Sequence, residues 1–434
     1  MDHIQVQQRR RGFSDRFAIV AFACVLLCLT GESWAWYFHN PHLTNFPWMA
    51  PFDRWADLWN YREKMLHLER GAAFVGRGSP VFNYLAPAAF VYHVLLRAPH
   101  PVATFTVLVV GAFALLLIAS GVLLVRRRLF RWEEMLALLA LAASYPMSFV
   151  VYRANLEGIV WAVVTAALCL FLSRRYMAAA IVLAMAMSIK PFPAILLLLF
   201  LARRQYRAAM LSVGVAVTLV LCGLAALGPG VIRAYQGLQY GVLLYTHQYI
   251  KTFRWPYEQQ YAHGILDCIR VLYLRWASTH AHIDPDKVIG TPTPVVFPLI
   301  YAVIALVIGV VMVWGLRRKP AVNQVLGASI GLTLLPPSSA DYTLCALYLP
   351  VLLLGYFLVT EVRSGRAVWG VRHMLLFVVP CAVLLSPLNL LGFWTTPLRL
   401  FLLLALAAGA ISLPLAIHAL DVSAQVAPAQ HVSA

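Results

Sequence analysis

The 434-residue chain is 62% hydrophobic and only 12% charged, and it has a formal net charge of +17. The charged share is about half that of a soluble domain, so a soluble globular protein is excluded because its core could not be covered. The apolar runs are long and lack period-2 alternation, which favours transmembrane helices over the strands of a barrel.

Most of the surplus positive charge lies in short clusters beside apolar segments. These clusters are at 9–11, 126–128, 174–175, 203–204 and 317–319. Basic residues mark the cytoplasmic ends of spans, so the charge predicts an orientation and no nucleic-acid partner. We expect both termini in the cytoplasm and, for a bacterial chain, a location in the inner (cytoplasmic) membrane. The seven cysteines form no Cys-x-x-Cys pair, so neither a metal site nor a disulfide framework is predicted.

The first apolar segment, 16–38, predicts a retained helix that leaves the cytoplasm, because no clear small-residue cleavage site follows it. A long segment at 39–100, rich in Trp, Pro and His, is then expected outside. Three spans follow, at 102–125, 133–150 and 156–172.

The apolar stretch between Arg175 and Arg203 is too short for two full crossings, which take about 40 residues. Both arginines are expected in the cytoplasm, so the chain must turn back within the membrane. Pro191 and Pro193 interrupt the stretch beside Lys190, and proline breaks a helix. We therefore predict two half-length helices that meet at Lys190, buried in protein or facing a water-filled cavity.

A span at 207–227 leads to a second outer segment, 231–293, which contains a short amphipathic helix at about 263–276. The remaining spans are expected at 294–316, 321–335, 342–360, 373–391 and 398–418. No internal repeat is visible. The sequence therefore predicts one all-α polytopic domain, 1–420, with about ten to twelve transmembrane helices, and a polar tail at 421–434.

The first outer segment carries Asp53 and Asp57 among aromatic residues that include Tyr61. Carboxylates near a membrane surface can act as general bases. The simpler interpretation is an interfacial helix whose aspartates pair with Arg54 or Arg62, and spacing alone favours it.

Arg153, Asn155 and Glu157 lie between two expected spans at the outer side. Arg153 and Glu157 are four residues apart, which fits an i,i+4 ion pair, or Arg153 could bind a phosphate at a cavity mouth. Lys190 sits deep in an apolar hairpin, where an ionisable residue indicates function. Its alternative is to snorkel to the surface.

Two further outer regions are polar. His247, Lys251, Arg254 and His263 form either a basic patch that faces lipid phosphates or an ordinary hydrated loop. Asp341 lies in a Pro- and Ser-rich turn, which loop chemistry alone could explain. No Gly-rich nucleotide loop, Ser-His-Asp set, metal-ligand spacing or haem motif is present, so no cofactor and no metal are predicted.

Several of these segments together resemble glycosyltransferase family 87 of the GT-C superfamily. The resembling residues are Ile189-Lys190-Pro191-Phe192-Pro193 with the basic turn after it, Arg153-x-Asn155-x-Glu157, Asp57-Leu58-Trp59-Asn60-Tyr61 and, loosely, Asn83-Tyr84-Leu85-Ala86-Pro87. Each motif is short, so the specificity comes from their order along most of the chain.

The resemblance implies a GT-C-like bundle that transfers a hexosyl group, mannosyl in the family's known activity, from a polyprenyl-phosphate sugar with inversion. The acceptor would be a lipid or a cell-envelope glycan on the non-cytoplasmic side. The family's outer-loop base matches Asp57, with Asp53 in reserve. Lys190 and Arg153 would hold the donor phosphate, and the expected substrate contacts are Tyr61, Asn155, Glu157, His247, Lys251, Arg254 and Asp341. The late outer turn, Ser338-Ser339-Ala340-Asp341-Tyr342, departs from the Trp and paired His that relatives often carry.

Two other functions fit a polytopic protein with a broken helix. A secondary transporter or flippase for a lipid-linked or small anionic substrate also uses broken helices and midplane charges, but it should show internal repeats. A non-catalytic protein that binds lipid-linked sugars is the third possibility. The polar residues gather on one side of this chain, which favours the glycosyltransferase.

Overall fold

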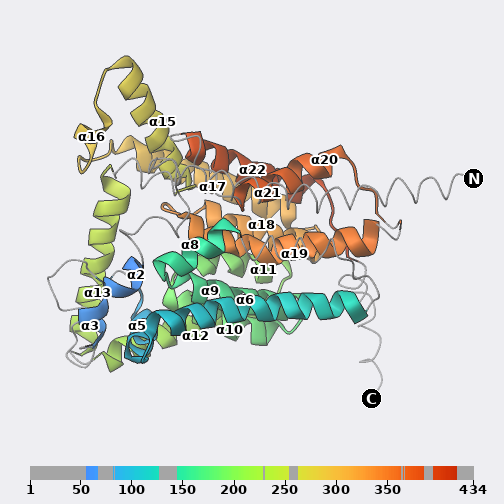
Figure 1. Cartoon of the computed structure of the whole chain (residues 1–434), viewed down its shortest axis with the longest axis horizontal. Coiled ribbons are helices and arrows are strands. Elements are labelled where there is room, and N and C mark those ends of the chain that lie inside the picture. The colour runs from blue at the N-terminus through green and yellow to red at the C-terminus, as the bar shows by residue number, and fades with distance from the viewer. Residues whose placement is uncertain are drawn as a thin grey trace, which may run out of the picture.

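The computed structural model describes residues 55–66, 82, 84–126, 144–227, 230–253, 262–362, 365, 367–385 and 394–417. Its named elements are all helical (Figure 1), and within these residues extended pairing is limited to two isolated antiparallel bridges. The expected helix at 16–38, most of the span at 133–150 and the tail at 421–434 lie outside the described residues.

Four helices in the described residues are long and apolar enough to cross a membrane. They are α12 (Tyr206–Ala226), α17 (Val296–Leu316), α22 (Thr395–Ser412) and the composite helix Asp341–Val362, made of η6 (Asp341–Leu347), α19 (Tyr348–Phe357) and η7 (Leu358–Val362). A fifth candidate joins α5 (Ala86–Arg97) to α6 (Pro101–Arg126), with a bend of 117° between them. The prediction of an all-α polytopic membrane protein is confirmed.

Several expected spans are shorter than the membrane is thick. These apolar helices are α9 (Glu157–Leu172), α10 (Tyr176–Ile189), the pair η4 (Phe192–Leu196) and α11 (Leu197–Ala202), α18 (Ala321–Leu334), and the segment Val371–Leu384, which comprises α20 (Val371–His373), η8 (Met374–Val378) and α21 (Val379–Leu384). α18 is buried along almost its whole length. A helix enclosed by protein, as α18 is, does not need to match the bilayer, so the expected spans in the described residues divide into long apolar helices that could cross it and shorter ones.

The broken hairpin forms where the prolines predict it. α10 ends at Ile189, Lys190 is extended with φ −134° and ψ 140°, and Pro191 leads into the 3₁₀ turn η4. α11 then returns the chain to Arg203. Because α10 packs along α9 and α12, the hairpin tip at Lys190 is enclosed by protein.

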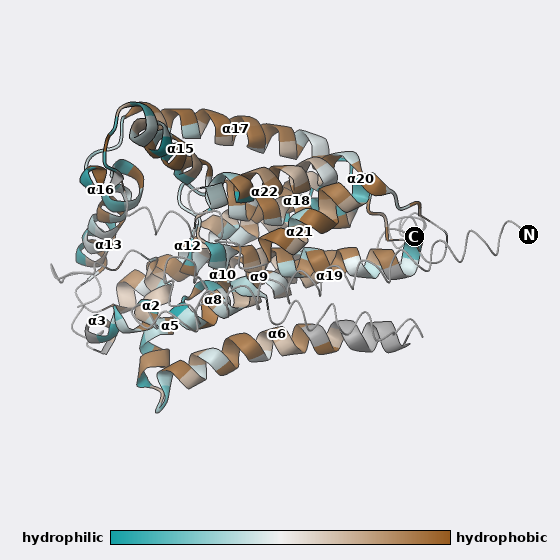
Figure 2. Ribbon diagram, turned by 45° about the horizontal axis from the view of Figure 1, so that its top comes forward, coloured by the Kyte–Doolittle hydropathy of each residue, from teal (hydrophilic) through white to brown (hydrophobic). Residues whose placement is uncertain are grey.

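The two ends of the bundle differ in composition. Helices α9, α11 and α17 end at the basic clusters 174–175, 203–204 and 317–319. The opposite end carries short elements, seen at the left of Figure 1: α2 (Ala56–Trp59), α3 (Arg62–Leu66), α13 (Val231–Tyr245), α15 (Ile265–His280) and α16 (Pro285–Val288). Figure 2 shows α6 and α17 hydrophobic along most of their drawn length, whereas hydrophilic residues gather around α13 and α16.

Part of the first outer segment belongs to the core, contrary to the prediction. Ala86, Ala88, Ala89 and Tyr92 of α5 are fully buried against α10 and α12. A Cβ on Gly223 of α12 would lie 3.0 Å from the Ala86 Cβ, so small residues bring the two helices together. The amphipathic helix of the second outer segment is confirmed as α15, which ends four residues later than expected.

Close packing at Gly158 gives a test of this arrangement. A Cβ there would lie 2.6 Å from Val150 Cγ1 and 2.8 Å from Val109 Cγ2, whereas a Cβ at Gly214 would meet nothing within 4 Å. We expect Gly158→Ala to lower stability by about 1–3 kcal/mol through overpacking. Gly214→Ala should be neutral or stabilising by up to about 1 kcal/mol. Thermal unfolding of both variants in detergent measures this, and equal midpoints would contradict the α6–α8–α9 packing.

Candidate active site

Asp57 is placed by a short helix that is fastened to the end of α8 (Tyr145–Arg153). The Trp55 N–H donates to the Tyr152 carbonyl at 2.7 Å, and Trp55 has a left-handed φ of 59°. α2 therefore begins directly beside Arg153, although 96 residues separate Asp57 from Arg153 in the chain.

The Asp57 carboxylate is held by two side chains from the α8–α9 junction. Two guanidinium nitrogens of Arg153 donate to it: Nη2 to Oδ1 at 2.8 Å and Nε to Oδ2 at 3.3 Å. The Asn155 amide donates to the same Oδ2 at 2.8 Å. A bidentate guanidinium fixes the plane of a carboxylate as well as its charge, so Asp57 is oriented.

A second ion pair lies on the other side of Asn155. Lys190 Nζ donates to Glu157 Oε2 at 2.6 Å and to Asn155 Oδ1 at 3.3 Å. Lys190 and Glu157 are each 8% exposed. Lys190 does not snorkel, because the extended residue at the hairpin tip directs it inward to a buried carboxylate.

The turn between α8 and α9 separates the two ion pairs. Ala154 adopts a left-handed conformation, with φ 49°, and ends α8. The Asn155 Oδ1 then accepts the Glu157 N–H at 2.8 Å, an Asx-type turn that starts α9. Arg153 therefore pairs with Asp57 and Glu157 pairs with Lys190, so the simple i,i+4 interpretation of Arg153 and Glu157 is wrong.

Aromatic rings enclose the lysine. Lys190 Nζ lies 5.2 Å from the Tyr84 ring centroid and 5.3 Å from that of Tyr342, within cation–π range. Tyr61 packs edge-on against Tyr84 at 5.9 Å. Burial raises the pKa of Tyr61 and that of Tyr84, so both phenols stay neutral and can donate hydrogen bonds.

Exposure is graded across the network. The side chains of Arg153 and Asp57 are 25% and 16% exposed, against 10% and 11% for Lys190 and Glu157. The Arg153–Asp57 pair therefore faces outward and the Lys190–Glu157 pair faces the protein interior. A ligand that arrived from the end of the bundle carrying α2 would meet Asp57 and Arg153 first.

The other expected substrate residues are not part of this network. His247 and Lys251 are exposed on η5 (Thr246–Lys251), and Asp53 and Arg254 lie outside the described residues. Asp341 is fully buried: Arg399 Nη1 lies 2.8 Å from its Oδ2, and His263 Nδ1 lies 3.3 Å from its Oδ1. Roles for these residues in substrate binding stay predictions.

The Asp341 cluster also contains a Ser-His-Asp chain that the sequence spacing did not reveal. Ser339 Oγ lies 3.0 Å from His263 Nε2, and the same nitrogen lies 3.0 Å from Thr343 Oγ1. Ser339 is only 2% exposed and His263 is fully buried. The cluster joins α22 and the late turn to the segment before α15. Because its side chains are buried, we assign it a structural role.

Three residues of functional interest were missed by the sequence analysis. Arg399 had a visible signal, a charge inside the apolar segment 398–418. Tyr84 and Tyr342 stand in segments that the sequence analysis compared with the family, but it gave them no role because they reach Lys190 only through tertiary contacts. Among the described residues, no group of three or more His, Cys, Asp or Glu side chains gathers in a way that could hold a metal ion.

Comparison with known proteins gives one match. The model of glycosyltransferase family 87 matches residues 82–339, more than half of the chain. This range includes four of the five network residues, and Asp57 lies before it. Comparisons with curated proteins and with solved structures gave no match.

Substituting the buried lysine tests the network as a unit. Lys190→Met would leave the Glu157 carboxylate buried without its cation, which costs about 3–5 kcal/mol of stability. Adding Glu157→Gln removes that charge and should restore part of the loss. Lys287→Met, on exposed α16, should change stability by less than about 0.5 kcal/mol. Unfolding midpoints of the unaltered protein, the two single variants, the double variant and the Lys287→Met control measure this. A double variant as unstable as the sum of its single changes would contradict the pairing.

Proposed function

The chain belongs to glycosyltransferase family 87, and we propose that it moves a hexosyl group from a polyprenyl-phosphate sugar to a lipid or cell-envelope glycan. The reaction inverts the anomeric carbon and takes place on the non-cytoplasmic side. That the protein is a membrane glycosyltransferase follows from the family and the apolar helices. The donor, the acceptor and the mechanism are the proposal.

The bridging position of Asn155 is the observation that carries the mechanism. Its amide nitrogen binds Asp57 and its amide oxygen binds Lys190. Asn155 therefore lies between Asp57, a carboxylate that can accept a proton, and Lys190, a cation that can stabilise a phosphate. Sugar transfer from a phosphate donor needs these two groups at the two ends of the reacting centre.

Asp57 is the proposed general base. An ionised carboxylate has about four acceptor positions, and Arg153 and Asn155 fill three of them. The remaining position can take the acceptor hydroxyl. Because the guanidinium fixes the carboxylate plane, that hydroxyl is oriented toward the anomeric carbon with little freedom to lose.

Arg153 and Lys190 are proposed to bind the donor phosphate. The acceptor oxygen forms its bond to the anomeric carbon as the carbon–oxygen bond to the phosphate breaks. The hydroxyl proton goes to Asp57 and the negative charge stays on the departing polyprenyl phosphate. Two cations in an enclosed site stabilise that charge strongly because little water screens it. The steps proposed here use no metal and no other cofactor.

The orientation is proposed from the charge at the two ends. The basic clusters at 174–175, 203–204 and 317–319 follow helices that run away from the Lys190 tip. Basic clusters are typical of the cytoplasmic side, so the network would face the opposite side of the cytoplasmic membrane.

The base assignment is tested by Asp57→Asn, which keeps the shape of the side chain and removes its basicity. Transfer from a labelled polyprenyl-phosphate sugar should fall about 10²–10⁴-fold, the usual contribution of a general base. Asp284→Asn, on the exposed turn before α16, is the matched control and should keep full activity. Unfolding midpoints of both variants separate a catalytic loss from a folding defect.

Two outcomes would contradict the proposal. Full transfer by Asp57→Asn would overturn Asp57 as the base. Absence of transfer by the unaltered protein with every polyprenyl-phosphate hexose, together with uptake of such a lipid or a small anion into vesicles, would favour a transporter or flippase.

A further inference from the structure

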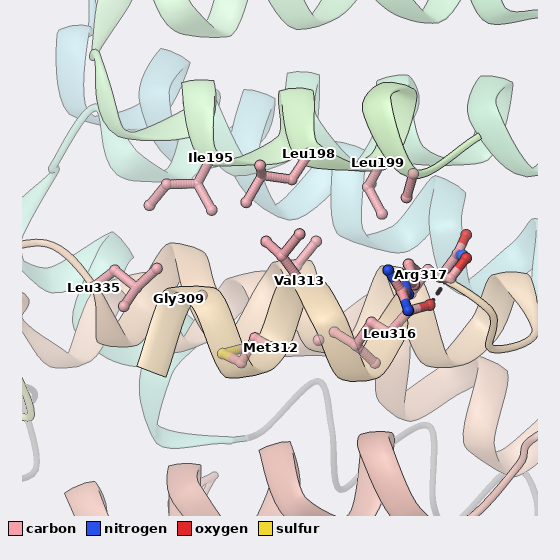
Figure 3. Close-up of a pocket in the computed structure, with 14 residues that line it drawn as sticks. Ile195, Leu198, Leu199, Gly309, Met312, Val313, Leu316, Arg317 and Leu335 are labelled. Atoms are coloured by element: carbon pink, nitrogen blue, oxygen red, sulfur yellow. Dashed lines mark hydrogen bonds between the residues drawn. The ribbon is translucent and has the colours of Figure 1, made fainter. Parts of the chain in front are cut away.

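A groove lies between α11, α17 and α18, apart from the Asp57–Lys190 network. It has about 50 Å³ of space for the centre of a water-sized sphere, and about 460 Å³ of unfilled space when the part open to the surroundings is included. Figure 3 shows Leu198 and Leu199 of α11 across from Val313 of α17, with Arg317 at one end; Met312 also lines the groove. Apart from Arg317 and Gln324, its lining is apolar or glycine.

Gly309 leaves the groove open on α17, and exposed apolar residues border it. A Cβ on Gly309 of α17 would meet no atom within 4 Å, so the space beside it is open. Val313 is 43% exposed at the rim, whereas Met312 is 6% exposed at the floor. α17 is the least buried candidate span, with 11% of its apolar window inside the protein. An apolar space of this kind excludes water. Because α17 is an exposed apolar helix, lipid hydrocarbon is the material next to the groove that can occupy it.

The end of the groove at Arg317 is basic. Arg203 Nε donates to Gln324 Oε1 at 2.8 Å, and Gln324 Nε2 donates to the carbonyls of Leu316 and Arg317. The Arg317 guanidinium lies 3.4 Å from the Trp314 ring centroid. Within the described ranges, neither Arg203 nor Arg317 pairs with a carboxylate. Two guanidiniums fixed at the mouth of an apolar groove match a phosphate joined to a hydrocarbon chain.

We infer that this groove binds an anionic glycerophospholipid, with its phosphate at Arg203 and Arg317 and one acyl chain along α17. The eight residue-to-residue steps from Gly309 to Arg317 span about 12 Å at 1.5 Å per residue. One leaflet of hydrocarbon is about 15 Å thick, half of the full core, so the groove suits a chain from the leaflet at the basic end. The anionic charge of the cytoplasmic leaflet adds to the attraction.

This ligand differs from the sugar donor, whose phosphate is proposed to bind Lys190 and Arg153. The cations of the groove, Arg203 and Arg317, lie at the opposite end of the hairpin from Lys190, because α11 runs from the tip to Arg203. The lipid would join the hairpin to α17 and α18. Its effect on stability is therefore measurable whether or not the proposed sugar transfer is correct.

The full-length protein is delipidated in detergent and titrated with phosphatidylglycerol or with phosphatidylcholine of the same acyl chains. Thermal unfolding should shift upward with phosphatidylglycerol concentration, as binding to the folded state requires, and less with phosphatidylcholine. Arg203→Gln with Arg317→Gln should weaken the apparent affinity for phosphatidylglycerol by about tenfold or more, because two charge-assisted contacts are lost. Gly309→Leu should fill the groove and abolish the shift, without a clash in the folded protein.

The matched control is Arg175→Gln with Arg207→Gln, which removes the same charge from exposed positions near the same end and should keep the full shift. A full shift in Gly309→Leu would overturn the groove, and unchanged affinity in the Arg203–Arg317 variant would overturn the phosphate position. A shift with undecaprenyl phosphate but not with phosphatidylglycerol, lost in Gly309→Leu, would assign the groove to the donor's tail and overturn the inference.

Discussion

Asn155 is the side chain on which the arrangement of the site depends. Its amide nitrogen holds the Asp57–Arg153 pair and its oxygen holds the Lys190–Glu157 pair, while the same oxygen starts α9. Charges enclosed in an apolar bundle persist only when they are paired and hydrogen-bonded. A neutral set of two carboxylates and two cations meets that constraint. It also fixes four chain segments, α2, α8, α9 and the hairpin tip, relative to one another.

This constraint explains why the central helices can be short. α9 begins and α10 ends beside the polar network, and the extended backbone at Lys190 is tolerated because protein surrounds it. A second buried set of charged and polar residues, Arg399, Asp341 and His263, holds the late turn against α22. The long apolar helices α12 and α17 then provide the lipid-facing surface. The chemistry and the membrane anchoring are thus carried by different helices.

The sequence was sufficient to predict the all-α class, the broken hairpin and the position of Lys190 at its tip, because proline, basic clusters and span length are local signals. It could not pair Asp57 with Arg153, since the contact joins segments far apart in the chain. Helical spacing paired Arg153 with Glu157 wrongly because the left-handed Ala154 interrupts the helix between them. α5 was placed in the outer segment because the stretch 39–100 is rich in Trp, Pro and His, and packing against α10 and α12 brings this helix into the core. Asp341 was grouped with the substrate residues on its loop position, and tertiary contacts with Arg399 and His263 bury it instead.

A density map of the protein with a non-transferable phosphonate analogue of a polyprenyl-phosphate hexose tests the central claim most directly. The account predicts the phosphonate within hydrogen-bonding distance of Arg153 and Lys190, with the anomeric carbon facing Asp57 and the prenyl chain leaving between helices. A sugar bound at another end of the bundle, with the Asp57–Asn155–Lys190 network intact and untouched, would contradict it.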